Sequence, residues 1–216
     1  MAGVSGRHTL ESLTADALAM GENKPRAVLG VAGSPGAGKT TLVEKLCELI
    51  EERRGPGWVA HVPMDGFHLA DGQLRRLGLL DRKGAPETFD AAGYAHLLER
   101  LRTELDTDVY APGFDRVLEQ PVAGALVVPP TAQLVLTEGN YLLLDDPVWG
   151  RARRALDCVW FVAADEQTRL RRLIARHVEF GKSPAAARAW VAEVDQRNAA
   201  LVAASTPAAD RVIALG

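Results

Sequence analysis

The stretch Gly33-Ser34-Pro35-Gly36-Ala37-Gly38-Lys39-Thr40 follows a short apolar run and precedes apolar residues at helical spacing. In this G-x-x-x-x-G-K-[ST] pattern, glycines let the backbone turn tightly and direct consecutive N–H groups at an anion, beside the positive end of the next helix. Lys39 would add a full charge at nucleotide phosphates, and a glycine-rich turn that binds nothing would need neither Lys39 nor Thr40. The stretch predicts a phosphate-binding loop, whose nucleotide-binding residues are the eight quoted and Thr41.

The flanking residues supply the strand and the helix that such a loop requires. Residues 27–31 predict a short buried strand, and residues 41–54 place their apolar side chains at helical intervals. Further strands are expected at 58–63, 133–137, 157–163 and 211–215, and helices at 9–20, 73–80, 91–105, 166–179 and 184–203. Alternation of strands with helices predicts an α/β fold: three layers, a parallel five-stranded sheet with helices on both faces, and a small helical lid.

The segment between the long helix at 91–105 and the strand at 133–137 has no clear period. Residues 109–120 (VYAPGFDRVLEQ) mix aromatic, proline, glycine and charged residues, which predicts a loop. A short strand within 122–128 is the alternative to a loop that continues through this segment.

Length and composition limit the class of protein. The 216 residues suit one domain over 1–216, with the lid at about 166–184, and a net charge of −3 provides no basic footprint for nucleic acid. No apolar run approaches the roughly 18 residues of a membrane span or resembles a signal peptide. The two cysteines, Cys47 and Cys158, lack metal-ligand or redox spacing. We therefore expect a cytoplasmic protein that binds neither nucleic acid nor membrane.

Asp65 is the candidate catalytic base. It follows the apolar run 58–63, and carboxyl ends of strands form the ligand-binding edge of open α/β sheets. We expect that strand to lie next to the strand of the phosphate loop, so that the carboxylate faces the γ-phosphate and can orient or deprotonate an acceptor hydroxyl. The alternative is that Asp65 and Gly66 only form a turn.

Glu138 is the candidate second ligand of Mg²⁺, together with Thr40. It ends the apolar run 134–136, where phosphate-loop enzymes place an acidic residue that meets the metal directly or through water. An acidic helix cap is the alternative interpretation.

Three arginines, Arg169, Arg172 and Arg176, occupy one face of the helix expected at 166–179. They could form a solvated basic face. They could instead belong to a lid, with Gly181-Lys182 at its tip, that neutralises charge on the transferred phosphoryl group. The lid role is favoured for Arg172 and Arg176, and the two interpretations stay balanced for Arg169. Lys39, Asp65, Arg172 and Arg176 are thus the expected catalytic residues.

These motifs together resemble the uridine kinase, phosphoribulokinase and pantothenate kinase group of phosphate-loop kinases. The resemblance rests on the loop, Met64-Asp65-Gly66-Phe67, Glu138-Gly139 and Arg172-x-x-x-Arg176, and spans about residues 26–182. It implies a kinase fold and the use of ATP, including the preference for adenine.

The subfamily motifs are mixed. Residues 83–90 (KGAPETFD) resemble the pantothenate kinase pattern, whereas residues 110–116 are similar to an acceptor loop of uridine kinases. His177 stands where uridine kinases usually carry an aspartate. The overall pattern is similar to a bacterial branch named as nucleoside or nucleotide kinases, or as kinases associated with fructose uptake.

Aromatic rings and cations suit a polyol, a ribose or a small acid. The expected acceptor-binding residues are therefore His68, Lys83, Tyr110, Phe114 and Arg116. Ordinary loop packing is the alternative for Tyr110 and Phe114, and a purely structural histidine is the alternative for His68.

The expected function is ATP- and Mg²⁺-dependent transfer of a phosphoryl group to a hydroxyl of a nucleoside, a sugar or a pantothenate-like metabolite. The competing hypothesis is a nucleotide-binding regulator or ATPase switch without an acceptor, linked to a transport system. No Asn-Lys-x-Asp motif for reading guanine follows the loop. The expected partner is the small-molecule acceptor, and a homodimer is left open.

Overall fold

A five-stranded parallel sheet forms the centre of the computed structural model, which describes residues 8–214. The strands lie in the order β2-β5-β1-β6-β7, so the predicted strand number and direction are confirmed. Their bounds are β1 Ala27–Ala32, β2 Val59–His61, β5 Leu134–Gly139, β6 Cys158–Ala163 and β7 Arg211–Ala214. The expected end of the last strand at residue 215 lies outside the described residues.

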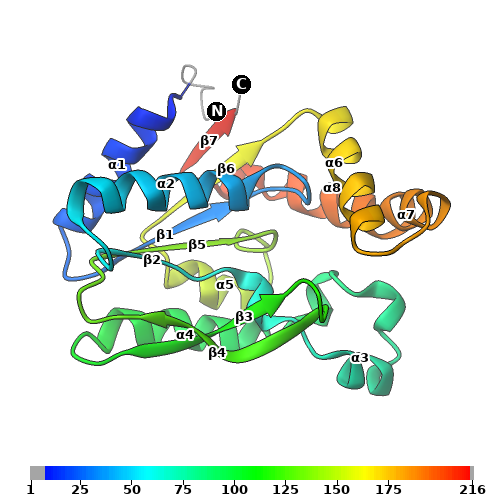
Figure 1. Cartoon of the computed structure of the whole chain (residues 1–216), viewed down its shortest axis with the longest axis horizontal. Helices are drawn as coiled ribbons and strands as arrows, with labels where there is room; N and C mark the ends of the chain where they lie inside the picture. Colours follow the sequence, from blue (N-terminus) through cyan, green and yellow to red (C-terminus); the bar gives the residue numbers. More distant parts are fainter. Residues whose placement is uncertain (1–7, 215–216) are drawn as a thin grey trace.

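Helices cover both faces of this sheet (Figure 1). On one face, α1 (Leu10–Glu22) and α2 (Lys39–Arg54) bury Leu13 and Leu46 against Leu29 of β1. On the other face, α4 (Ala91–Thr103) and α5 (Pro147–Arg154) bury Leu98 and Trp149 against the neighbouring strand residue Val28. Because successive side chains of a strand point to opposite faces, a continuous apolar run supplies two cores.

Helix α6 (Glu166–Glu179), which lies within the predicted lid, and helix α7 (Pro184–Trp190) lie beyond the carboxyl ends of the strands (Figure 1). Helix α8 (Gln196–Ala204) follows them and buries Val202 in the core. The helix expected at 184–203 is present, but a π-helical turn at Val191–Asp195 interrupts it. A π turn inserts an extra residue, so it changes the direction of the side chains on either side of it.

The prediction of a loop at 109–120 is wrong. Residues Val109–Asp115 (β3) and Gln120–Val128 (β4) form an antiparallel hairpin below the sheet, with an irregular register between Ala111 and Gly113 (Figure 1). Proline is confined to edge strands and bulges, and Pro112 at this irregularity hides the alternation that would have revealed β3. The alternative of a strand within 122–128 is confirmed.

Two further helices differ from expectation. Helix α5 was not predicted, although Asp146 caps its first turn and Pro147 occupies its first position, both ordinary start signals. Helix α3 covers Asp71–Leu77 rather than 73–80, because Gly78 ends it in a left-handed conformation. Short 3₁₀ turns follow at Leu80–Arg82 and Pro86–Thr88.

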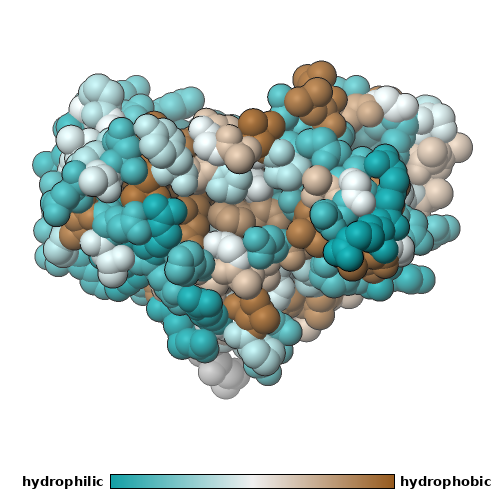
Figure 2. All heavy atoms as spheres, turned by 90° about the horizontal axis from the view of Figure 1, so that it is seen from below, coloured by the Kyte–Doolittle hydropathy of each residue, from teal (hydrophilic) through white to brown (hydrophobic). Residues whose placement is uncertain are grey.

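Seen from below, the surface is mostly hydrophilic, and hydrophobic residues gather near its middle between two lobes (Figure 2). Within residues 8–214, no helix has both the length and the apolar character needed to span a bilayer.

Candidate active site

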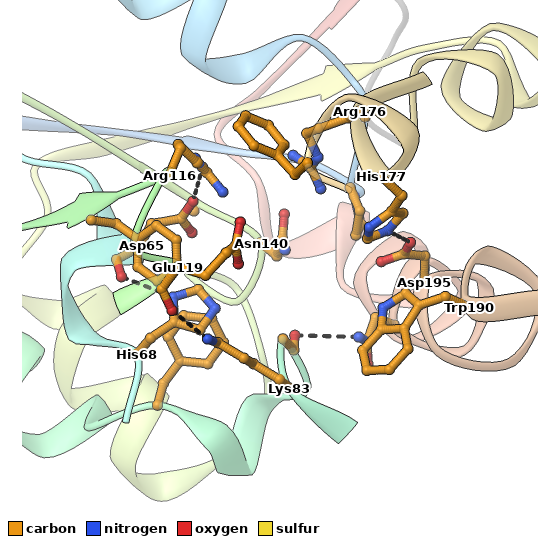
Figure 3. Close-up of a pocket in the computed structure, with 18 of the residues that line it drawn as sticks. Asp65, His68, Lys83, Arg116, Glu119, Asn140, Arg176, His177, Trp190 and Asp195 are labelled. Atoms are coloured by element: carbon orange, nitrogen blue, oxygen red, sulfur yellow. Dashed lines mark hydrogen bonds and ion pairs between the residues drawn. The ribbon is translucent and has the colours of Figure 1, made fainter. Parts of the chain in front are cut away.

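A cavity of about 420 Å³ opens at the carboxyl ends of the strands (Figure 3). Its wall combines the phosphate-loop motif, the end of β5, the 3₁₀ turn Met64–Phe67, the hairpin β3–β4 and residues of α6 to α8. These segments are distant in the sequence and converge because parallel strands end at one edge of the sheet.

The glycines of the motif leave room for an anion. Gly36 and Gly38 have φ of 78° and 95°, a left-handed conformation that side chains rarely adopt. A Cβ atom at Gly36 would also lie 2.9 Å from the carbonyl oxygen of Arg169. Helix α2 begins directly after the loop, at Lys39, so its N-terminus faces the cavity edge. This cradle fits phosphate groups, as the motif predicts.

Lys39 is only 7% exposed and lines the cavity. Its Nζ donates to Asn140 Oδ1 at 2.7 Å and to the Ser34 carbonyl at 3.3 Å. Burial lowers the pKa of Lys39, and the neighbouring carboxylates Glu138 and Asp65 partly restore it. Negative phosphate charge would stabilise this cation further.

Thr40 and Glu138 meet across the first turn of α2. The hydroxyl donates to Glu138 Oε1 at 2.8 Å, although 98 residues separate the two in the chain. Strand β5 lies beside β1 with Val31 opposite Glu138, which brings this carboxylate next to the loop. Burial raises the pKa of Glu138, and Lys39 partly offsets this. Two adjacent oxygen donors of this kind fit Mg²⁺ shared with phosphates.

Asp65 and Arg116 form an ion pair inside the cavity, with Arg116 Nη2 at 2.5 Å from Asp65 Oδ2. Burial alone would raise the pKa of Asp65, but interaction with the His68 ring and with the cations Arg116 and Lys39 lowers it by more, so the carboxyl is ionised at neutral pH. The carboxylate is therefore ready to accept a hydrogen bond from a hydroxyl group.

The expectation that Asp65 follows a strand adjacent to β1 is wrong. Strand β2 pairs only with β5, which separates it from β1. Asp65 nevertheless reaches the cavity, because the 3₁₀ turn carries the chain past the sheet edge. This turn lies close to β3: a Cβ atom at Gly66 would be 2.1 Å from the Pro112 carbonyl oxygen. Glycine therefore allows the approach that brings Asp65 and Arg116 together.

His68 lies between two aromatic rings, with centroids 4.0 Å from Phe89 and 4.8 Å from Phe114. Its Nδ1 donates to the Asp65 carbonyl at 2.8 Å. Burial lowers the pKa of His68 despite the opposing effect of Asp65, so the ring is neutral and Nε2 is an acceptor.

Lys83 reaches the cavity from the loop after α3. Its Nζ donates to Asp71 Oδ1 at 2.7 Å and to the Glu119 carbonyl at 2.5 Å, and it lies 5.6 Å from the Phe114 ring centroid. The structure thus brings together four of the five expected acceptor residues.

Tyr110 is the exception: it is 62% exposed and does not line the cavity. Its neighbours Val109 and Ala111 are buried, so alternation along β3 turns Tyr110 to the other face of the hairpin. The placement of Tyr110 in the acceptor pocket is therefore wrong.

The three lid arginines have different surroundings. Arg176 lines the cavity and points into it (Figure 3). Arg172 is exposed, with Nη1 3.4 Å from the Gly36 carbonyl. Arg169 is only 7% exposed, so it belongs to no solvated face: it donates to the Pro35 carbonyl at 2.9 Å and to Gln196 at 3.1 Å. Arg169 therefore stabilises the phosphate loop through its hydrogen bond to the Pro35 carbonyl.

Replacing Arg169 with methionine is expected to lower the free energy of unfolding by about 1–3 kcal/mol, because the buried Pro35 carbonyl loses its donor. For a chain of this size the melting temperature should fall by several degrees. Arg171→Met is the matched control, since Arg171 is exposed on the same helix. Equal melting temperatures of the two variants would show that Arg169 does not support the loop.

Several cavity residues were not among the predicted site residues: Asp71, Glu119, Asn140, Trp190, Asp195 and Asn198, and also His177. Asn140 directly follows Glu138-Gly139 at the end of a predicted strand, so its position in the sequence could have indicated that it lies at the site. The others lie at the start of α3, at the hairpin tip, in α6 and in the interrupted helix formed by α7, the π-helical turn and α8, where local periodicity does not show which side chains face a cavity.

No protein-family model matches the chain. A protein of Schizosaccharomyces pombe, provisionally named a uridine kinase, is 34% identical over 74% of this chain and 70% of its own length. A pantothenate kinase of Leifsonia xyli is 31% identical over 77% of this chain, which spans about half of that enzyme.

A solved kinase-like structure is similar to this chain over nearly its whole length. A protein of Silicibacter sp. TM1040, provisionally named a fructose transport system kinase, is 35% identical with a TM-score of 0.86, over 95% of this chain and 98% of that one.

Proposed function

Because the chain belongs to the uridine kinase and pantothenate kinase group of P-loop kinases, we propose that it transfers the γ-phosphoryl group of ATP to a hydroxyl of a small metabolite. The relatives are named kinases, which supports phosphotransferase chemistry in general. The acceptor class, a nucleoside, a sugar or a pantothenate-like molecule, belongs to the proposal.

The observation that carries the proposal is the position of Asp65. Its ionised carboxylate shares one cavity with Lys39 and with the pair of Thr40 and Glu138. A protein that only binds a nucleotide needs the loop and the metal ligands, but it does not need a second carboxylate held by an arginine opposite them. A transferase needs such a group to orient the acceptor.

In the proposed mechanism, Lys39 and the loop amides would hold the phosphates, and Thr40 and Glu138 would hold Mg²⁺. When bound, Mg²⁺ neutralises phosphate charge. Asp65 accepts the hydroxyl proton as the acceptor oxygen forms its bond to the γ-phosphorus and the bond to the bridging oxygen of ADP breaks.

Two lid arginines complete the proposed site. Arg176 already points into the cavity, where it would neutralise charge on the transferred group. Arg172 lies outside at the loop, so it would reach the phosphates only when α6 moves inward.

A coupled assay of ADP release tests the proposal. The purified protein, ATP and Mg²⁺ are combined with nucleosides, pantothenate, sugars or polyols, and a reaction without acceptor is the blank. At least one acceptor is expected to raise ADP release well above the blank and to yield a phosphorylated product detectable by mass spectrometry. Failure of every acceptor would favour the regulator or ATPase switch.

A further inference from the structure

Glu119 is the only residue other than glycine within 8–214 with a positive φ, 54°. It lies at the tip of the hairpin β3–β4, its carbonyl accepts from Lys83, and its side chain lines the cavity. Within the described part of the chain, its carboxylate has no hydrogen-bond or ion-pair partner. A left-handed glutamate is conformationally costly where glycine would fit, and such strain concentrates at functional sites.

The opposite wall presents a second carboxylate (Figure 3). Asp195 ends the π-helical turn, is only 7% exposed and accepts from His177 Nε2 through Oδ2 at 2.8 Å. Its other oxygen, Oδ1, has no hydrogen-bond partner among residues 8–214. Trp190 stands beside this pair, with its ring centroid 6.4 Å from that of His177, and Lys182 lies 4.7 Å from the Trp190 ring.

The charges of this half of the cavity are unfavourable for an anion. The residues around the proposed acceptor space are four carboxylates and three cations, which are Asp65, Asp71, Glu119, Asp195, Lys83, Arg116 and Lys182. Lys83 and Arg116 are paired with Asp71 and Asp65 respectively, and Lys182 beside Trp190 offsets only one of the two remaining carboxylates, so this half keeps an excess of negative charge. The remaining carboxylates, Glu119 and Asp195, would repel a carboxylate or phosphate on the acceptor.

We propose that the acceptor is a neutral, polyhydroxylated molecule of the sugar or polyol class, bound between Glu119 and Asp195. This inference rests on the proposed kinase function. Each carboxylate accepts hydrogen bonds from hydroxyl groups that are not phosphorylated, while Phe114 and Trp190 pack against the C–H faces of the molecule. His177 positions Asp195 by holding one of its oxygens.

The test compares neutral acceptors, fructose, ribose and sorbitol, with the anionic acceptors gluconate and glycerate. The neutral acceptors are expected to have the highest kcat/KM. Glu119→Gln and Asp195→Asn should each raise the acceptor KM about tenfold or more and leave the KM for ATP unchanged, because each weakens a charge-assisted hydrogen bond. Glu193→Gln, an exposed position in the same π-helical turn, is the matched control.

Glu119→Gly separates a binding role from a structural role. Glycine adopts the left-handed conformation freely, so the melting temperature should stay the same or rise, while the acceptor KM rises as in Glu119→Gln. A higher kcat/KM for gluconate or glycerate, or an unchanged acceptor KM in both carboxylate variants, would overturn this inference and leave the kinase function standing. So would turnover with a nucleoside or pantothenate and none with the sugars and polyols, whereas absence of turnover with all of these acceptors would overturn both.

Discussion

Asp65→Asn is expected to lower kcat by about 10²–10⁴-fold on the best acceptor, the usual contribution of a positioned acid–base group. This loss corresponds to about 3–5 kcal/mol of transition-state stabilisation. Asparagine keeps the shape and one acceptor oxygen for Arg116, so the pair seen at 2.5 Å can persist as a neutral hydrogen bond. What the variant loses is the ability to take the hydroxyl proton. The measurement is the steady-state rate of ADP release with saturating ATP and acceptor.

The matched control is Asp81→Asn, an exposed aspartate in the 3₁₀ turn after α3 that does not line the cavity. It should keep the wild-type rate. If Asp65→Asn retains near wild-type kcat with an unchanged melting temperature, Asp65 is not the base, and the turn formed with Gly66 is its only role.

Lys39→Met should reduce kcat/KM for ATP by about 10²–10³-fold, similar to the loss of one preorganised donor to developing charge. Methionine has a similar length and no charge, so the variant removes the cation that Nζ supplies beside Asn140. Burial already lowers the pKa of Lys39, so charge is maintained here at a cost that phosphate binding would offset. Calorimetry measures the loss of ATP affinity, and the rate of ADP release measures the loss of turnover.

Lys45→Met is the control for this variant, because Lys45 is exposed on the same helix α2. Its kinetics should match the wild type. Tight ATP binding and normal turnover in Lys39→Met would mean that the loop amides alone hold the phosphates.

The phosphate loop and the sheet were predictable because their signals are local. The glycines before Lys39 have few backbone alternatives, and each buried strand is a continuous apolar run. The proximity of Thr40 and Glu138 followed from one further rule, that parallel strands end at the same edge.

The hairpin and the wall opposite Asp65 were not predictable in this way. Pro112 hides the alternation of β3, and the orientation of Tyr110 depends on which face of the hairpin packs inward. The pair of His177 and Asp195 joins two helices, and a π-helical turn sets the direction of one partner. Arg169 has the spacing of a surface residue but is buried, because α8 packs over it.

By itself, the sequence determined the five strands of the parallel sheet, the phosphate loop with its helix and the kinase group, since these depend on neighbouring residues and on periodicity. Only the tertiary structure decided the strand order that places β5 between Asp65 and the loop strand, and the set of side chains that line the acceptor half of the cavity. The physical reason is that a side chain's surroundings depend on packing between segments far apart in the chain, and this packing leaves no periodic trace in either segment.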